Sequence, residues 1–343
     1  MADTTPQAAA AKLTIKDFQS DQDVRWCPGC GDYSILAQVQ RVFPEFTHLK
    51  ENYVAVSGIG CSSRFPYYMD IYGIHGIHGR APAIATGVKL ANPDLDVWVA
   101  TGDGDGLSIG GNHMIHMLRR NINIKVLLFN NQIYGLTKGQ YSPTSVLGQI
   151  TKSTPHGVID YPFVPVSLAL GAGATLVARA MDRDPKHLQE VIRRAEQHHG
   201  SAFIEIYQNC NVFNDKAFAE LTGKDERLAN RIVLQHGKPV VFGADGAKGV
   251  VLRGGSARIV DVAEVGLDAL HVHDEHLPDP GAAFALSRLS HGPHGPTPVG
   301  VFRDVPRPAY EDDLQRQMSE TQSRRGPADL AELIRQTGTW QVG

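Results

Sequence analysis

Two short motifs place oxygen ligands and flexible backbone where a metal bound to a diphosphate needs them. A GDG motif occupies residues 102–104, and Asn130 and Asn131 follow further along the chain. A carboxylate at the end of one parallel strand and an amide at the end of the next can converge on one hard cation, and magnesium suits these oxygen ligands. The flanking glycines let the backbone approach a diphosphate, and a helix expected to begin near Ser108 directs its amino terminus at that anion. The two motifs together predict a magnesium and diphosphate site rather than a simple turn.

The cysteines form a second candidate metal site. The sequence contains four of them, at Cys27, Cys30, Cys61 and Cys210. This number is too small for a disulfide scaffold and suits one metal site with four ligands. Cys27 and Cys30 form a CPGC pair, a spacing with which neighbouring thiolates chelate one centre. Taken alone, such a pair is typical of zinc or of a redox dithiol, and zinc is favoured.

These residues belong to longer stretches that resemble a known family. GDG followed by NN is the signature of the diphosphate-binding domain of thiamine diphosphate enzymes. The chain resembles the β subunit of the 2-oxoacid:ferredoxin oxidoreductases over about residues 24–215, in the stretches WCPGCGD, SGIGCSSR, HGIHGRA, GDGDGLSIGGNHMIHMLRRN and NNQIYGLTKGQYSPTS. Among these enzymes, the motifs are most similar to those of the 2-oxoglutarate members.

The resemblance implies ligands for two metal centres and a lining for the cofactor. Magnesium is expected to be held by Asp103, the Asn131 side chain and the Ile133 backbone carbonyl. Asp105 is a less favoured alternative. One [4Fe–4S] cluster is expected on Cys27, Cys30, Cys61 and Cys210. Thiamine diphosphate is expected to lie against Ile59, Gly60, Cys61, Ser62, His78, Gly104 and Gly135. A cluster beside the cofactor would accept the electrons of an oxidative decarboxylation one at a time.

Three side chains near these motifs are candidates for catalysis. Arg64 follows the cysteine loop, where a guanidinium can hold a substrate carboxylate through two hydrogen bonds, although many relatives have lysine there. Lys138 lies just past the magnesium site and is a candidate for substrate contact or loop control. His78 is expected to bond a phosphate or to act as a general acid–base rather than to form a metal pair with His75.

The other histidines are not favoured as catalytic or metal-binding residues. The HVHDEH stretch at 271–276 contains the residue types of a metal site, but a solvated loop is the favoured interpretation. His113 and His116 flank an expected helix, where packing or exposure to solvent explains them.

The elements that must position these residues are typical of a doubly wound α/β fold with a mostly parallel sheet of the thiamine diphosphate-binding type. Apolar runs with strand character alternate with segments of helical period. Strands are expected at 53–56, 97–100, 124–129 and 202–207. Helices are expected at 33–43, 82–91, 108–120 and 185–200, the last with Asp184 as its N-cap.

The chain divides into four parts: a flexible N-terminal segment at 1–23, a thiamine diphosphate and cluster domain at 24–220, a C-terminal extension at 221–310 and a charged tail at 311–343. The extension is expected to contain a hairpin in VVFGADGAKGVVLRGG and a loop-like stretch at 271–299. The tail is expected to be a helix or a mobile segment that lies on another surface.

Composition excludes several classes of protein. With 343 residues, 42% of them hydrophobic, the chain can bury a sizeable core. A formal net charge of -3 with both signs interspersed offers no basic patch for nucleic acid or an anionic membrane. No apolar run is long enough for a membrane span or a signal peptide, so a cytoplasmic location is expected.

The resemblance implies oxidative decarboxylation of 2-oxoglutarate with coenzyme A to succinyl-CoA, carbon dioxide and reduced ferredoxin. Pyruvate or broad 2-oxoacid specificity is the alternative, and a thiamine decarboxylase without redox chemistry would leave the cysteines unexplained. A non-catalytic protein stapled by zinc is a remote possibility. The chain has one domain of the thiamine-binding kind, so an α subunit should supply the aminopyrimidine side, a ferredoxin should accept electrons, and two heterodimers are expected to pair.

Overall fold

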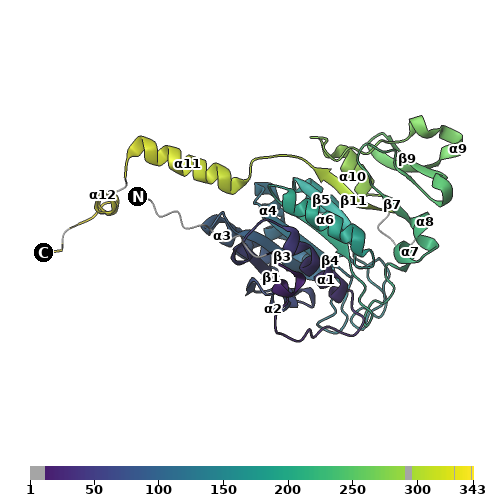
Figure 1. The fold of residues 1–343 in the computed structure, drawn as a ribbon, viewed down its shortest axis with the longest axis horizontal. Helices are drawn as coiled ribbons and strands as arrows, with labels where there is room; N and C mark the ends of the chain where they lie inside the picture. Colours follow the sequence, from purple (N-terminus) through teal and green to yellow (C-terminus); the bar gives the residue numbers. More distant parts are fainter. Residues whose placement is uncertain (1–11, 290–295, 328, 341) are drawn as a thin grey trace.

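An eight-stranded sheet forms the centre of the protein (Figure 1). The computed structural model describes residues 12–289, 296–327, 329–340 and 342–343. The strands follow the order β2-β1-β3-β4-β6-β5-β11-β7. Their bounds are β1 Tyr53–Ser57, β2 Tyr72–His75, β3 Asp96–Gly102, β4 Ile124–Asn130, β5 Leu176–Met181, β6 Ala202–Tyr207, β7 Arg231–Val233 and β11 Thr297–Asp304. Strands β1 to β6 are parallel, which confirms the predicted fold class.

Helices cover both faces of the sheet and create two cores. On one face, α1 (Asp32–Val42) packs beside α6 (Pro185–Gln197). The other face is covered by α3 (Ala81–Ala91), α4 (Gly111–Arg120) and α5 (Pro165–Gly171). Alternate residues of β3 face the two cores, because successive side chains of a strand point to opposite sides. The sheet is therefore buried on both faces, as its nearly continuous apolar strands require.

Each predicted strand and helix is present within a few residues of its expected bounds. Helix α6 begins after Asp184, whose side chain accepts a hydrogen bond from the His187 amide at 3.3 Å. Four strands of the sheet, β2, β5, β7 and β11, were not predicted. Strand β2 is short and mostly exposed at the sheet edge. Strand β5 contains Arg179, a charge that becomes acceptable in a buried strand only through its partner on β6.

The sequence-based boundary at residue 220 does not coincide with the edge of the sheet. The stretch 271–299, expected to be loop-like, contains α10 (Gly281–Ser287) and the start of β11, while residues 290–295 lie outside the described residues. Strand β11 runs antiparallel to β5 and parallel to β7. It thereby pairs the hydrogen-bonding groups that β5 would otherwise leave open.

The rest of the extension forms a separate small sheet. The predicted hairpin is present as β8 (Val241–Phe242) and β9 (Lys248–Arg253), and β10 (Ser256–Asp261) adds a third antiparallel strand. Five further short α-helices occur in the part of the chain that the structure describes: α2 Phe65–Tyr68, α7 Ala219–Thr222, α8 Glu226–Asn230, α9 Val262–Val265 and α12 Leu330–Arg335.

The segments near the two ends of the chain differ in how closely they pack on the body. Of the predicted N-terminal segment 1–23, residues 1–11 lie outside the described residues, whereas Ile15–Phe18 forms a short helix whose Phe18 is fully buried. In the charged tail, α11 (Tyr310–Arg325) leads away from the body, and most of its side chains are exposed (Figure 1). Among the described residues, no helix has the length and apolar character needed to cross a membrane.

Candidate functional site

The carboxyl ends of β1, β3, β4 and β6 lie along one edge of the sheet, here termed the carboxyl edge. Gly102 on β3 is opposite Phe129 on β4, and Asn130 is opposite Tyr207 on β6. The residues that follow these strands therefore emerge side by side. They line a cavity of about 1330 Å³, termed the large cleft, which includes the predicted lining residues Ile59, Gly60, Cys61, Ser62, His78, Gly104 and Gly135.

Asp103 lies at the floor of the large cleft and is buried, with 2% exposure. One of its carboxylate oxygens accepts hydrogen bonds of 2.5 Å from the hydroxyls of Ser142 and Thr144. Burial raises the pKa of Asp103 to about 6, against the lowering effect of these hydroxyls and of backbone amides. No positive charge is among the main causes of this pKa, and a bound cation would stabilise the ionised form. This carboxylate fits a magnesium ligand.

The first asparagine of the NN dipeptide holds Asp103 indirectly. The Asn130 side-chain oxygen lies 2.9 Å from the Thr144 hydroxyl and is the alternative acceptor for its one proton, and the Asn130 amide donates to Glu205 at 2.6 Å. Glu205 is paired with Arg179 at 2.7 Å, and both side chains are fully buried. Sequence reasoning missed this chain of contacts, because its members are far apart in sequence. Only the YSPTS stretch, which contains Thr144, hinted at hydroxyl donors near the site.

Asn131 and Ile133 lie in the same cleft as Asp103. The Asn131 amide donates to Gln208 at 2.8 Å, and its oxygen accepts a hydrogen bond from the Ile133 backbone amide at 3.2 Å. These bonds orient the side chain at the end of β4. The structure therefore brings the three predicted magnesium residues to one cavity.

Asp105, the alternative magnesium ligand, is already fully engaged. Its carboxylate accepts hydrogen bonds from the backbone amides of Ile59 at 3.0 Å and Gly79 at 2.7 Å. It also accepts them from His78 Nδ1 at 2.7 Å and from the Thr101 hydroxyl at 2.5 Å. Asp105 thus connects the loop after β1 with the His78 loop, and the geometry favours Asp103 for the metal. Because Nδ1 of His78 carries the proton, Nε2 is the nitrogen left for a ligand.

Glycine is required at position 104 for steric reasons. A Cβ atom at Gly104 would lie 2.2 Å from the Tyr134 ring, whose hydroxyl donates to the Gly104 carbonyl at 3.0 Å. Tyr134 therefore packs directly on the backbone next to Asp103.

The four cysteines, all free, line one cavity of about 150 Å³ termed the cysteine pocket. The loop before α1 reaches it through the Gly31 amide, which donates to Asn209 just before Cys210 at 3.2 Å. Asn211 also donates to the Pro28 carbonyl at 2.6 Å. The Trp26 indole donates to the carbonyl of Cys61 at 2.7 Å. Hydrogen bonds between loops thus bring the cysteines together.

Burial makes the ionised thiolate form of cysteines in this pocket unfavourable. Burial, with Asp32 and the other cysteines as further causes, raises the pKa of Cys30 far above its usual value and that of Cys61 to about 12. Gln208 donates to the Cys30 sulfur at 3.4 Å. Buried thiolates become stable when a metal centre supplies positive charge, so the pocket fits a metal or iron–sulfur centre with four thiolate ligands.

The two cationic candidates lie beside the cysteines. Arg64 and Lys138 both line the cysteine pocket, and among the described residues neither lines the large cleft. The Arg64 guanidinium donates to the Arg25 carbonyl at 3.2 Å. Lys138 has φ of 82°, a left-handed conformation that a tight turn imposes, with its amide donating to the Gly135 carbonyl at 3.0 Å.

The remaining histidines fall outside this site. His75 Nδ1 lies 3.0 Å from the Ser57 hydroxyl and from the Ser63 carbonyl, separate from the contacts of His78. His113 and His116 lie on α4, half-buried and exposed. The solvated-loop interpretation of 271–276 is wrong for His273 and Glu275, which are buried. Their polar atoms find partners on other elements, which no local pattern could reveal.

Comparison with known proteins agrees with this geometry. Residues 58–206 match the family model of the thiamine pyrophosphate enzyme C-terminal TPP binding domain. The 2-oxoglutarate oxidoreductase subunit KorB of Mycobacterium tuberculosis is 56% identical over 95% of this chain and 88% of that protein. The β subunit of 2-oxoacid:ferredoxin oxidoreductase 1 of Aeropyrum pernix is 48% identical over 61% of this chain and 66% of that protein.

A solved structure supports the same assignment. The 2-oxoglutarate:ferredoxin oxidoreductase from Magnetococcus marinus, with 2-oxoglutarate, coenzyme A and succinyl-CoA bound, has a TM-score of 0.77 and 35% identity. The match covers 95% of this chain and 97% of that chain. The chain therefore belongs to the family of 2-oxoglutarate oxidoreductase β subunits, the KorB family, which confirms the resemblance of its motifs.

Proposed function

We propose that the chain is the β subunit of a 2-oxoglutarate:ferredoxin oxidoreductase and that it binds magnesium, the diphosphate of thiamine diphosphate and one [4Fe–4S] cluster. One observation carries the proposal. The large cleft and the cysteine pocket share a wall formed by Cys61, Asn131, Gly135 and Leu136. A Cβ atom at Gly135 would lie 3.5 Å from the Cys210 sulfur and 3.8 Å from the Cys61 sulfur. A cofactor in the cleft and a metal centre on the thiols would therefore lie next to each other.

Residues of the two cavities would have different roles in catalysis. When bound, thiamine diphosphate supplies the electron sink for decarboxylation of a 2-oxoacid, and an iron–sulfur cluster accepts single electrons. Asp103, Asn131 and the Ile133 carbonyl would hold magnesium. His78, oriented by Asp105, would hold or move a proton at Nε2. Arg64 and Lys138 would bind the substrate carboxylates from the cysteine side.

The large cleft supports the proposal of a partner subunit. Its volume of about 1330 Å³ exceeds the roughly 300–1,000 Å³ of a typical ligand pocket. Apolar side chains of Leu136, Tyr161 and Phe163 line it and are exposed. An α subunit that covers these side chains would close the cleft and contribute the aminopyrimidine side. Two such heterodimers would then pair about a two-fold axis, the commonest closed arrangement.

The comparisons favour 2-oxoglutarate as the substrate, with coenzyme A as acyl acceptor and a ferredoxin as electron acceptor. The relative from M. tuberculosis and the structure from M. marinus are both named for 2-oxoglutarate. A broad 2-oxoacid specificity, pyruvate included, is the second candidate, because the relative from A. pernix is named for 2-oxoacids in general.

The test is anaerobic viologen reduction by the co-expressed α and β subunits with coenzyme A and pyruvate, 2-oxoglutarate or a branched 2-oxoacid. We expect the highest kcat/KM with 2-oxoglutarate, and no turnover from the β chain alone after reconstitution with iron, sulfide, magnesium and thiamine diphosphate. Equal kcat/KM for all acids would favour the second candidate. Zinc in place of iron and sulfide in the anaerobically purified complex would contradict the cluster.

A further inference from the structure

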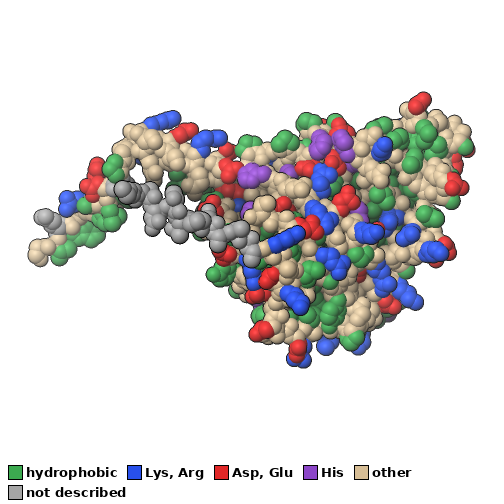
Figure 2. Space-filling view, viewed as in Figure 1, with side chains coloured by type: hydrophobic (Ala, Val, Ile, Leu, Met, Phe, Trp, Pro, Cys, Tyr) green, Lys and Arg blue, Asp and Glu red, His purple; other side chains and the backbone are tan. Residues whose placement is uncertain are grey.

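Three possible metal ligands meet away from the thiamine site. His236 lies in the connection between β7 and β8, whereas Glu275 and His276 precede α10. One ligand atom from each residue lies within 4.8 Å of the other two. The group is beside Asp304, which is opposite Leu176 at the start of β5, so it lies toward the edge of the sheet opposite the carboxyl edge. In Figure 2, histidine side chains gather on the face drawn, near the junction of the body and the small sheet.

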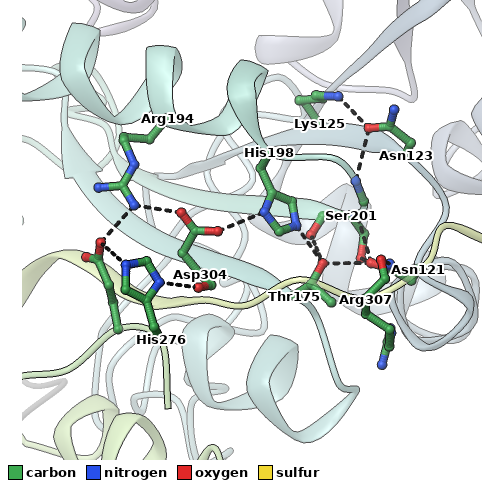
Figure 3. A network of polar contacts seen from close by, with 12 residues as sticks. Asn121, Asn123, Lys125, Thr175, Arg194, His198, Ser201, His276, Asp304 and Arg307 are labelled. Atoms are coloured by element: carbon green, nitrogen blue, oxygen red, sulfur yellow. Dashed lines mark hydrogen bonds and ion pairs between the residues drawn. The ribbon is translucent and has the colours of Figure 1, made fainter. Parts of the chain in front are cut away.

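The His276 ring is held in the orientation of a metal ligand. Its Nδ1 lies 2.7 Å from the backbone carbonyl of Asp304 (Figure 3). Because a carbonyl only accepts, Nδ1 carries the proton, and the neutral ring has its free electron pair at Nε2. A hydrogen bond from the second ring nitrogen to a backbone carbonyl is the usual support of a metal-binding histidine.

The spacing of the ligand atoms also suits a metal. His276 Nε2 lies 3.6 Å from Glu275 Oε1, which is too long for a hydrogen bond. Two ligands of a tetrahedral zinc ion, each about 2.0–2.1 Å from it, lie roughly 3.3 Å apart. The His236 and His276 ring centroids are 4.8 Å apart, so small movements of two exposed side chains would close the site.

The surrounding charges favour a cation. Glu275 is buried, and its Oε1 lies 2.8 Å from Arg194, which also pairs with Asp304 at 2.6 Å. Asp274 lies 3.5 Å from His236. Two of these carboxylates pair with the Arg194 guanidinium, and the third, that of Asp274, faces His236. His198 Nδ1 lies 2.8 Å from Asp304, and its Nε2 lies 2.7 Å from the Thr175 hydroxyl (Figure 3). These contacts involve three carboxylates and one guanidinium, so negative charge is in excess.

We propose that His236, Glu275 and His276 bind one divalent transition-metal ion of the zinc class, with a water as the fourth ligand. Two imidazole nitrogens and one carboxylate oxygen suit zinc, whereas magnesium and calcium prefer oxygen ligands alone.

The role of this ion is structural. Its ligands lie in connecting segments of the C-terminal extension, and they contact the main sheet and its helices through Arg194 on α6 and Asp304 on β11. The same segment is attached by His273, whose Nε2 lies 2.8 Å from the Val301 carbonyl. A metal here would cross-link the segments that join the small sheet to the main sheet, and it would have no contact with the proposed thiamine site.

The experiment uses the α and β subunits purified as a complex with its native iron content. The complex is dialysed with a mild chelator and then against zinc, and bound zinc per β chain is measured by elemental analysis. Zinc K-edge absorption distinguishes nitrogen and oxygen ligands from cysteine sulfur. The variants are His236→Gln and His276→Gln, and the matched control is His199→Gln, an exposed histidine that pairs with Asp312.

We expect one zinc per wild-type β chain with nitrogen and oxygen ligands only, and the same value in the control. Both glutamine variants should lose this zinc while keeping their iron content and viologen activity. Zinc should raise the thermal unfolding midpoint of the wild type and the control, but not of the variants. The proposal is overturned if the wild type binds no zinc, if the bound zinc has sulfur ligands, or if both variants keep it.

Discussion

The oxygen side and the sulfur side of the candidate site are built in different ways. On the oxygen side, Asp103 is held by buried hydroxyls, and Asn130 and Glu205 extend the hydrogen bonds into the sheet. On the sulfur side, the cysteines come from separate loops, and burial raises the pKa of Cys30 and Cys61. The comparison indicates that the protein by itself preorganises the proposed magnesium ligands, whereas the cysteines would need the proposed metal centre to become stable thiolates.

The largest expected effect comes from Cys210→Ser. This change removes one thiolate of the proposed cluster, and no other cysteine exists to replace it. We expect loss of the cluster and of viologen reduction, together with looser packing of the loop before α1. Iron and sulfide analysis, with limited proteolysis of the complex, measures both. An unchanged iron content and visible spectrum would show that another residue completes the site.

The reciprocal change, Asp103→Ala, should affect the oxygen side alone. We expect magnesium-dependent binding of thiamine diphosphate to be abolished while iron content stays at the wild-type level, because Asp103 has no contact with the cysteines among the interactions described. Calorimetric titration with the cofactor, with and without magnesium, measures this. Wild-type affinity in the variant would refute the assignment. Asp105→Asn is the comparison, and we expect it to disturb the His78 loop rather than the magnesium dependence.

A smaller effect is expected for Arg64→Ala, which separates substrate binding from cluster binding on the sulfur side. Loss of a charge-assisted contact costs about 1.5–3 kcal/mol, or roughly a tenfold to hundredfold increase in KM. We expect this increase for 2-oxoglutarate and little change for coenzyme A. Steady-state kinetics of the complex with each substrate varied in turn gives the answer. The comparison variant is Lys138→Ala, which shows whether removal of another positive side chain from the same pocket raises the KM for 2-oxoglutarate equally.

The smallest effect is expected for Thr144→Val, which tests the preorganised character of the oxygen side. Valine keeps the shape of threonine but removes the hydroxyl that donates its proton to Asp103 or to Asn130. A hydrogen bond to a charged group contributes about 1.5 kcal/mol or more, so magnesium affinity should fall about tenfold. The control is Thr86→Val, whose hydroxyl bonds only within α3. If both variants bind magnesium equally well, the hydroxyls are not part of the site's organisation.

The predictions from sequence succeeded where strands that a local apolar pattern reveals are also neighbours in the sheet. The GDG and NN motifs follow two neighbouring strands, and their apolar runs fixed the strands well enough to place Asp103 and Asn131 at one edge. The loop-like interpretation of 271–299 was wrong at α10 and at the start of β11, and β11 is stabilised by pairing with β5 rather than by its own periodicity. The same limit concealed β5, whose Arg179 is buried only because Glu205 neutralises it.

The sequence by itself determined the types of ligand, because each carboxylate, amide or thiol is a property of a single residue. It also determined their places at the ends of parallel strands. Only the tertiary structure decided which distant groups meet. It paired Asn130 with Glu205, brought Cys210 beside Cys61, and placed His236 next to His276. Such contacts depend on sheet order and on the burial of charges in neutralising pairs, and both arise only when the whole chain packs.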